Sequence, residues 1–165
     1  MADFDKEMLY EQLNNFQIQR HDFLNFFQVI KGYLQLKMPD KALNYIDDVL
    51  EDIRPQQDIY RIGNKTLLGL LLGWYFMLRL KGIKYRLEFP PEMKNEEFWE
   101  KHWREEYAQS FFGYTKECSD MSVMLDPEGY QGVILLGSLE GGFTCDYGLF
   151  KGDTCVKQKS YTTGQ

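Results

Sequence analysis

Apolar side chains spaced alternately three and four residues apart run through the first 36 residues of the chain. They are Leu9, Leu13, Phe16, Phe23, Phe27, Ile30 and Leu34, with Arg20 at the intervening position. This spacing puts all of them on one side of a helix, so the sequence predicts a helix over residues 5–36 with a heptad-type apolar seam. Helices in globular proteins average about 11 residues, and a much longer one is stable only when its apolar side packs against other helices.

A second helix is predicted after a short connection at residues 37–40. Pro39 suits the first position of a helix, and Pro55 with the polar residues after it predicts the end near residue 53. Two helices alone leave much apolar surface exposed. Either the rest of the chain covers this surface, or a second copy of the chain covers it. The seam favours pairing, so we expect residues 1–60 to form an antiparallel helical hairpin that dimerises into a four-helix bundle.

The second half, residues 61–165, shows a mixed pattern of helices and strands. Asn64 predicts the N-cap of a buried helix that extends to about Lys81. Alternating residues predict a strand at 83–89, and a further helix is expected at 96–114. Three more strands are predicted at 122–126, 131–139 and 143–150, while the order of 152–165 is left open. The expected fold class is α+β, with the hairpin followed by a small α/β domain.

One histidine lies among polar residues of the first predicted helix. His21 shares a helical face with Asn25 and Gln28, whereas the seam points elsewhere, so the imidazole is expected to reach solvent. A hydrogen-bonded structural role is the alternative. Gly32 costs about 1 kcal/mol relative to Ala inside a helix, which indicates either the close approach of a neighbouring helix or a tolerated surface glycine near a helix end.

The run from Arg20 to Leu36 resembles the phosphoacceptor hairpin of the sporulation initiation phosphotransferase B family and of related sensor histidine kinases. That family shows the pattern R-H-D/E-x-x-N-x-x-Q-x-I-x-G-x-x-x-L, and every fixed position is present here. The resemblance is specific over residues 20–53, weaker over 64–89 and almost absent beyond. It implies that His21 carries a phosphoryl group, that the bundle is dimeric, and that the second domain is similar to a degenerate histidine-kinase ATP-binding domain.

Nucleotide-binding motifs are missing from the second half. The predicted helix at 96–114 has no Asn to hold magnesium, and neither Asp-x-Gly-x-Gly nor a P-loop pattern occurs. The other histidine, His102, has no partner at metal-ligand spacing. We therefore expect no metal and no cofactor of the protein's own. Magnesium is expected on a partner receiver domain, and the phosphoryl group must come from another protein.

Composition narrows the function classes further. A net charge of −6 without a cluster of Lys and Arg argues against nucleic-acid binding. The longest apolar run, residues 67–78, is shorter than the roughly 20 residues that span a membrane, and no secretory signal is visible. The three cysteines, Cys118, Cys145 and Cys155, form no Cys-x-x-Cys pair, which favours reduced thiols in the cytoplasm.

The predicted function is that of a phosphorelay phosphotransferase. His21 is expected to take a phosphoryl group from the aspartate of one response-regulator receiver domain and pass it to another, with the resemblance pointing to sporulation initiation. The alternative is a non-catalytic bundle protein that binds a response regulator or a histidine kinase and inhibits it. A sensor kinase with a divergent ATP site is less favoured, because the ATP motifs are missing.

Six neighbours of His21 are assigned expected roles. Asn25 either contacts the phosphoryl oxygens or a water, or is only a polar surface residue. Asp22 either biases the tautomer of the imidazole or is an exposed carboxylate, and Arg20 either offsets phosphate charge or extends out of the bundle. The remaining three, expected to contact a docking receiver domain, are Asn14, Gln17 and Gln28.

Overall fold

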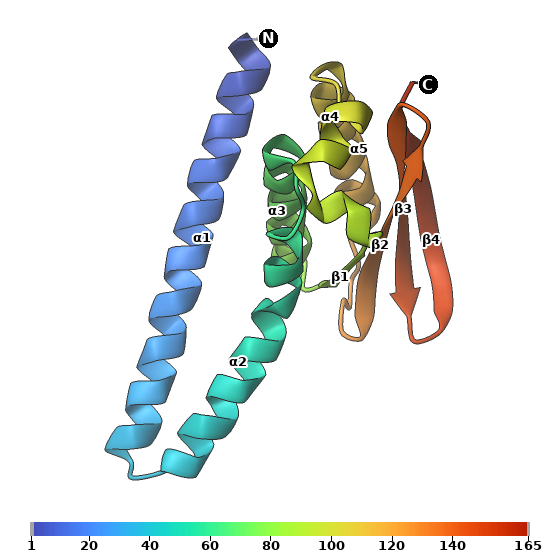
Figure 1. Cartoon of the computed structure of the whole chain (residues 1–165). Coiled ribbons are helices and arrows are strands. Elements are labelled where there is room, and N and C mark those ends of the chain that lie inside the picture. The colour runs from blue at the N-terminus through green and yellow to red at the C-terminus, as the bar shows by residue number, and fades with distance from the viewer. Residues whose placement is uncertain (1, 165) are drawn as a thin grey trace. The chain divides into compact units, whose positions relative to one another are not determined.

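The computed structural model describes residues 2–164, which divide into two compact units at the junction between Gln57 and Asp58. Figure 1 shows the order of the elements along the chain. The first unit is helical, and the second combines helices with a sheet. Each unit is described separately below.

The first unit is a hairpin of two long helices, α1 (Ala2–Gln35) and α2 (Pro39–Ile59) (Figure 1). The turn between them satisfies the last carbonyl groups of α1. The amide of Lys37 donates to the carbonyl of Leu34 at 3.0 Å, and the amide of Met38 donates to that of Tyr33 at 2.9 Å. Lys37 has a φ of 56°, the left-handed conformation that commonly ends a helix. The predicted hairpin is confirmed, with Pro39 at the start of α2.

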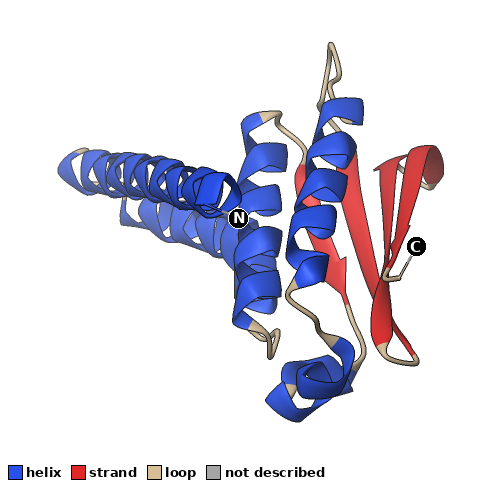
Figure 2. Ribbon diagram, turned by 90° about the horizontal axis from the view of Figure 1, so that it is seen from above, coloured by secondary structure: helices blue, strands red, loops and turns tan. Residues whose placement is uncertain are grey.

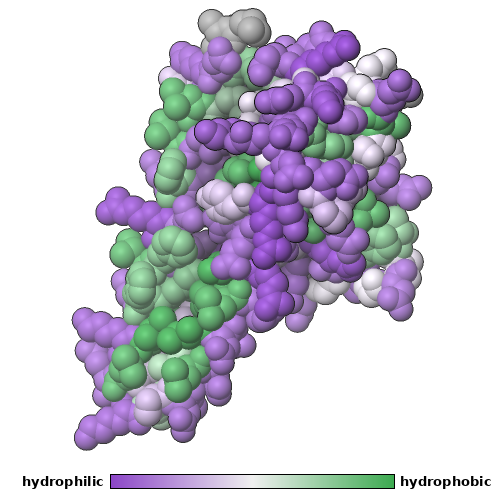
Figure 3. All heavy atoms as spheres, viewed as in Figure 1, coloured by the Kyte–Doolittle hydropathy of each residue, from purple (hydrophilic) through white to green (hydrophobic). Residues whose placement is uncertain are grey.

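Aromatic side chains join the two helices. The ring of Tyr45 lies 6.4 Å from that of Phe26 and 6.3 Å from that of Tyr33, both in edge-to-face geometry. The predicted seam lies on a different side of α1 and is largely exposed: the exposed fraction is 68% for both Phe16 and Phe27. Figure 3 shows apolar side chains gathered over the part of the hairpin near its turn.

The predicted end of the second helix near residue 53 is wrong. The helix continues through Pro55 to Ile59, although a proline inside a helix lacks an amide donor and crowds the preceding turn. The residues that follow explain the continuation, because Ile59 and Ile62 are buried. Burial of one such side chain stabilises by about 1.5–3 kcal/mol, which is comparable to the cost of the proline.

The second unit contains α3 (Lys65–Leu80), β1 (Lys84–Glu88), a short 3₁₀ helix (Pro91–Lys94), α4 (Glu96–His102), α5 (Glu106–Met121), β2 (Tyr130–Leu139), β3 (Gly142–Lys151) and β4 (Thr154–Thr162). Within the described residues the strands form a four-stranded sheet in the order β1-β2-β3-β4. β1 and β2 are parallel, and the other neighbours are antiparallel. Figure 2 shows α3 and α5 on one face of the sheet. The α+β fold class is confirmed.

Trp74 of α3 lies at the centre of the core of the second unit. Its ring is within 6.5 Å of those of Tyr85, Phe111, Tyr114 and Tyr147, which come from both the sheet and α5. Asn64 caps α3 as predicted, since its side chain accepts a hydrogen bond from the amide of Leu67 at 2.8 Å. The core therefore fixes α3 and α5 against the sheet through aromatic contacts.

Two predictions for the second unit differ from the structure. The single helix expected at 96–114 is two helices, because Trp103 is extended so that its ring stacks on Phe143 at 5.9 Å. The strand expected at 122–126 is a loop, because the hydroxyl of Ser122 is held by the carbonyl of Cys118 at the end of α5. The tail, whose order was left open, contributes β4 to the edge of the sheet.

Buried thiols and phenols make the second unit sensitive to high pH. Burial raises the pKa of Cys118 and of Tyr147 to about 12, and it also raises the pKa values of Tyr85, Tyr114 and Cys145. The unfolded chain releases these protons from about pH 8.5, whereas the folded chain keeps them. We therefore expect the free energy of unfolding to fall as the pH rises from about 8.5 towards 12.

Urea unfolding followed by circular dichroism between pH 7 and 11 measures this dependence. The variant Cys145→Ala removes one buried thiol, so its free energy of unfolding should fall less steeply between pH 8 and 9.5. Stability that does not change over this range would contradict the expectation.

Candidate functional site

His21 stands in the interior of α1, where unbroken helical backbone on both sides fixes the position of its Cα. Its side chain is 75% exposed, as the sequence predicts, and that of Asp22 is 25% exposed. An imidazole that projects from a rigid helix is accessible to a second protein without a change in backbone conformation. The chemistry then depends on which ring nitrogen is available.

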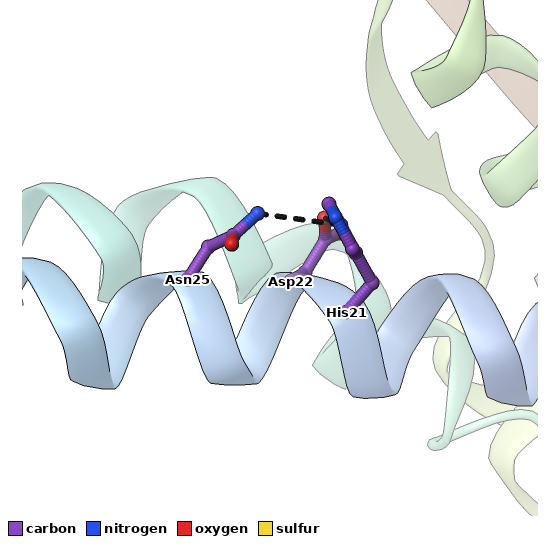
Figure 4. A network of polar contacts seen from close by, with 3 residues as sticks. All are labelled: His21, Asp22 and Asn25. Atoms are coloured by element: carbon purple, nitrogen blue, oxygen red, sulfur yellow. Dashed lines mark hydrogen bonds and ion pairs between the residues drawn. The ribbon is translucent and has the colours of Figure 1, made fainter.

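Both polar contacts of His21 involve the same ring nitrogen, Nδ1 (Figure 4). Asn25 Nδ2 lies 3.3 Å from Nδ1, and Asp22 Oδ1 lies 4.0 Å from it. Nε2 takes part in neither contact. The contacts of the ring therefore lie on its Nδ1 side, and Nε2 is outside them.

The two contacts favour opposite tautomers of a neutral imidazole. An amide NH₂ donates, so Asn25 as placed favours a lone pair on Nδ1 and a proton on Nε2. A carboxylate only accepts, so Asp22 favours a proton on Nδ1 and a lone pair on Nε2. Reversal of the Asn25 amide places Oδ1 toward Nδ1, and both neighbours then favour the nucleophilic form of Nε2.

Arg20 lies on the seam side of His21. It is exposed and lines a hollow of about 240 Å³ together with Phe16, Phe23 and Phe27. Within the described residues it makes no hydrogen bond or ion pair with His21. The structure therefore leaves Arg20 apart from the imidazole and places it next to the exposed apolar surface.

The three residues expected to contact a partner lie on the same side of α1 as His21. Asn14, Gln17 and Gln28 are all exposed, at helical spacings of seven, four and seven residues from the histidine. Residues at these spacings line one face of a helix. They form an uncharged strip around the imidazole.

His102 occupies a different environment in the second unit. It donates Nδ1–H to the carbonyls of Leu139 and Gly142 at 2.9 and 3.0 Å, and its ring stacks on Phe98 at 4.0 Å. The histidine thus joins α4 to the turn between β2 and β3. Sequence reasoning missed this structural role because the partners are 37 and 40 residues away. Among residues 2–164, no group of three or more His, Cys, Asp or Glu side chains is placed to hold a metal ion.

The first unit is thus an antiparallel hairpin of two long helices with an exposed histidine on the first. Residues 5–62 match the family model described as Sensor kinase SpoOB-type, alpha-helical domain. The match bears out the resemblance over the hairpin, and it does not extend to the sheet. A comparison with curated proteins finds no match. No helix within the described residues is both long and apolar enough to cross a membrane.

The different environments of the two histidines predict different reactivity. Diethyl pyrocarbonate acylates unprotonated imidazole nitrogen, so we expect His21 to react several-fold faster than His102, whose Nδ1–H is held by two carbonyls and whose ring is covered by Phe98. Mass spectrometry of proteolytic peptides measures both rates. In His21→Gln the rate at His102 should be unchanged, and equal rates at the two histidines in the unsubstituted chain would contradict the geometry.

Proposed function

We propose that this protein is a phosphorelay phosphotransferase that acts in the cytoplasm, in a pathway such as sporulation initiation. His21 accepts a phosphoryl group from the aspartate of one receiver domain and transfers it to the aspartate of a second. The observation that carries the proposal is the exposed imidazole of a SpoOB-type hairpin, with Nδ1 contacted by Asp22 and Asn25 and with Nε2 outside both contacts.

The transfer forms one bond and breaks one. The lone pair of Nε2 attacks phosphorus, the bond between phosphorus and the aspartyl oxygen breaks, and its electron pair stays on the partner's carboxylate. The imidazole then carries phosphorus on Nε2 and a proton on Nδ1, and its positive charge is stabilised by Asp22. Loss of that proton to solvent gives neutral phosphohistidine. The reverse sequence delivers the phosphoryl group to the second receiver domain.

This chemistry depends mainly on positioning. Phosphoryl transfer requires in-line placement and stabilisation of charge, which a rigid helix and the magnesium ion of the partner supply. Asn25, one turn from His21, orients the ring or contacts the phosphoryl oxygens. Asn14, Gln17 and Gln28 offer the partner hydrogen bonds without charge. The protein itself uses no ATP, because its sequence lacks the nucleotide-binding motifs.

The exposed apolar seam of α1 supports the proposal that the hairpin dimerises. A hollow of about 170 Å³ on the hairpin is lined only by apolar residues, namely Phe23, Phe26, Phe27, Ile30, Ile46, Val49 and Leu50. Burial of each exposed Phe or Leu stabilises by about 1.5–3 kcal/mol, so the seam favours association with a second copy into a four-helix bundle. Arg20, which takes the intervening position in the seam, then lies near the interface between the two copies.

Phosphoryl transfer is tested with receiver domains of the source organism that have been phosphorylated on aspartate and desalted. We expect acid-labile label to appear on the unsubstituted chain and none on His21→Gln, which keeps the fold because the side chain is exposed. Asn25→Ala should transfer more slowly but not lose transfer, since it removes only a positioning contact. If the unsubstituted chain binds receiver domains and is never labelled, the non-catalytic function replaces this proposal.

Dimerisation is tested by sedimentation. Phe27→Asp places a charge in the middle of the seam, where burial of an unpaired carboxylate is costly, so we expect a monomer at concentrations at which the unsubstituted chain is a dimer. Asn14→Asp, which introduces the same charge at an exposed position of α1 outside the seam, is the control and should stay dimeric. An unsubstituted chain that is monomeric at high concentration would show that the seam does not pair.

A further inference from the structure

Arg20 is the only charged residue at the eight positions of the seam. The other seven positions carry Leu, Ile or Phe, and six of these side chains are at least 42% exposed. Arg20 is exposed as well, and it lines a hollow of about 240 Å³ with Phe16, Phe23 and Phe27. A charged or polar residue at one position of an apolar seam lowers the affinity between helices, and it determines which pairing of the helices forms.

The hairpin offers no carboxylate to Arg20. Side chains three and four residues apart are neighbours on a helix, and for Arg20 none of these neighbours is acidic. They are Phe16, Gln17, Phe23 and Leu24. Among residues 2–164, no ion pair joins the guanidinium to an acidic side chain. The charge therefore has to reach water when a second molecule covers the seam, because burial of an unpaired charge is costly.

Parallel pairing of two seams in register satisfies this requirement. Residues of the same number then lie opposite each other, so both arginines fall in one layer, where their stems pack on the rings and their charged ends extend to the edges. A slip by one heptad, about 10 Å, sets one Arg20 against Phe27 and the other against Leu13. Two layers of the interface would then place a guanidinium against an apolar side chain, so the slipped register is less stable.

Antiparallel pairing fails for a second reason. The only antiparallel register that keeps the two arginines together is centred on them. It sets Leu9 against Lys31 and Leu34 against Lys6, so the apolar residues at both ends of the seam would face charges. The sequence of the seam therefore disfavours this orientation as well.

We propose that Arg20 sets the register and the orientation in which two copies of the hairpin pair. The interaction surface is the seam, and its partner is a second copy of this chain in parallel orientation, with both Arg20 side chains in one layer. This inference rests on the proposed dimer and assigns a role to the residue that interrupts its seam. Pairing in register places the two His21 side chains at one level of the bundle, each outside the interface.

Sedimentation equilibrium of Arg20→Leu, Arg20→Lys and the matched control Asn14→Leu tests the proposal. Arg20→Leu makes all eight positions apolar, so the dissociation constant should fall about tenfold or more, and species larger than a dimer should appear. Arg20→Lys keeps a charge on a flexible stem and should behave like the unsubstituted chain. Asn14→Leu adds the same side chain at an exposed position outside the seam and should change neither quantity.

Electron paramagnetic resonance measures the register. A spin label on Asn44→Cys, an exposed position of α2, is used in a Cys155→Ser background, because Cys118 and Cys145 are buried. The two labels of a dimer should give one narrow distance distribution in the unsubstituted seam and in Arg20→Lys. In Arg20→Leu the distribution should broaden or gain a second distance, because other registers become populated.

One narrow distance together with an unchanged dissociation constant in Arg20→Leu would overturn the inference and leave the dimer standing. A weaker dimer in Arg20→Leu would also overturn it, since Arg20 would then make a stabilising contact. The same holds if Arg20→Lys behaves like Arg20→Leu. An unsubstituted chain that is monomeric would instead refute the proposed dimer, and transfer of label to His21 tests the phosphotransfer function separately.

Discussion

The exposed apolar seam of α1 is the constraint on which the organisation of the hairpin depends. A helix of 34 residues cannot be held by the 21 residues of α2 alone, and the aromatic contacts around Tyr45 cover only one side of it. A second side carries Phe16, Phe27 and the rest of the seam, and an apolar surface of this extent favours association. The third side carries His21 among the uncharged side chains Asn14, Gln17 and Gln28. His21 thus lies on the side that neither α2 nor the seam uses.

The second unit is stabilised instead by an aromatic core around Trp74. Its rings come from segments distant in sequence, so the sheet and its helices form one cooperative unit. The same core raises the pKa values of the buried thiols and phenols, since burial disfavours their charged forms. These groups stay protonated at neutral pH and are structural.

Periodic patterns predicted the hairpin well, because a long helix repeats the same signal many times. The seam and the exposure of His21 followed from spacing, and the start of α2 followed from Pro39. The end of α2 could not be predicted from local sequence, because the burial of Ile59 overrides the effect of Pro55 on the helix. The break between α4 and α5 was missed for a similar reason: Trp103 packs on Phe143, 40 residues away. β4 carries little apolar alternation, because much of it is exposed at the edge of the sheet.

The opposed contacts at Nδ1 were beyond sequence reasoning, and they bear on both steps of the proposed phosphoryl transfer. Adjacent helical residues diverge by about 100°, yet the Asp22 carboxylate still lies 4.0 Å from Nδ1. When the ring carries phosphorus on Nε2, a proton on Nδ1 makes it cationic and a better leaving group, and Asp22 favours that proton. With a lone pair on Nδ1 the phosphorylated ring is neutral and a poorer leaving group, and the Asn25 amide nitrogen favours this form. In the proposed transfer reaction, the balance between Asp22 and Asn25 therefore sets whether phosphohistidine at His21 is retained or passed on.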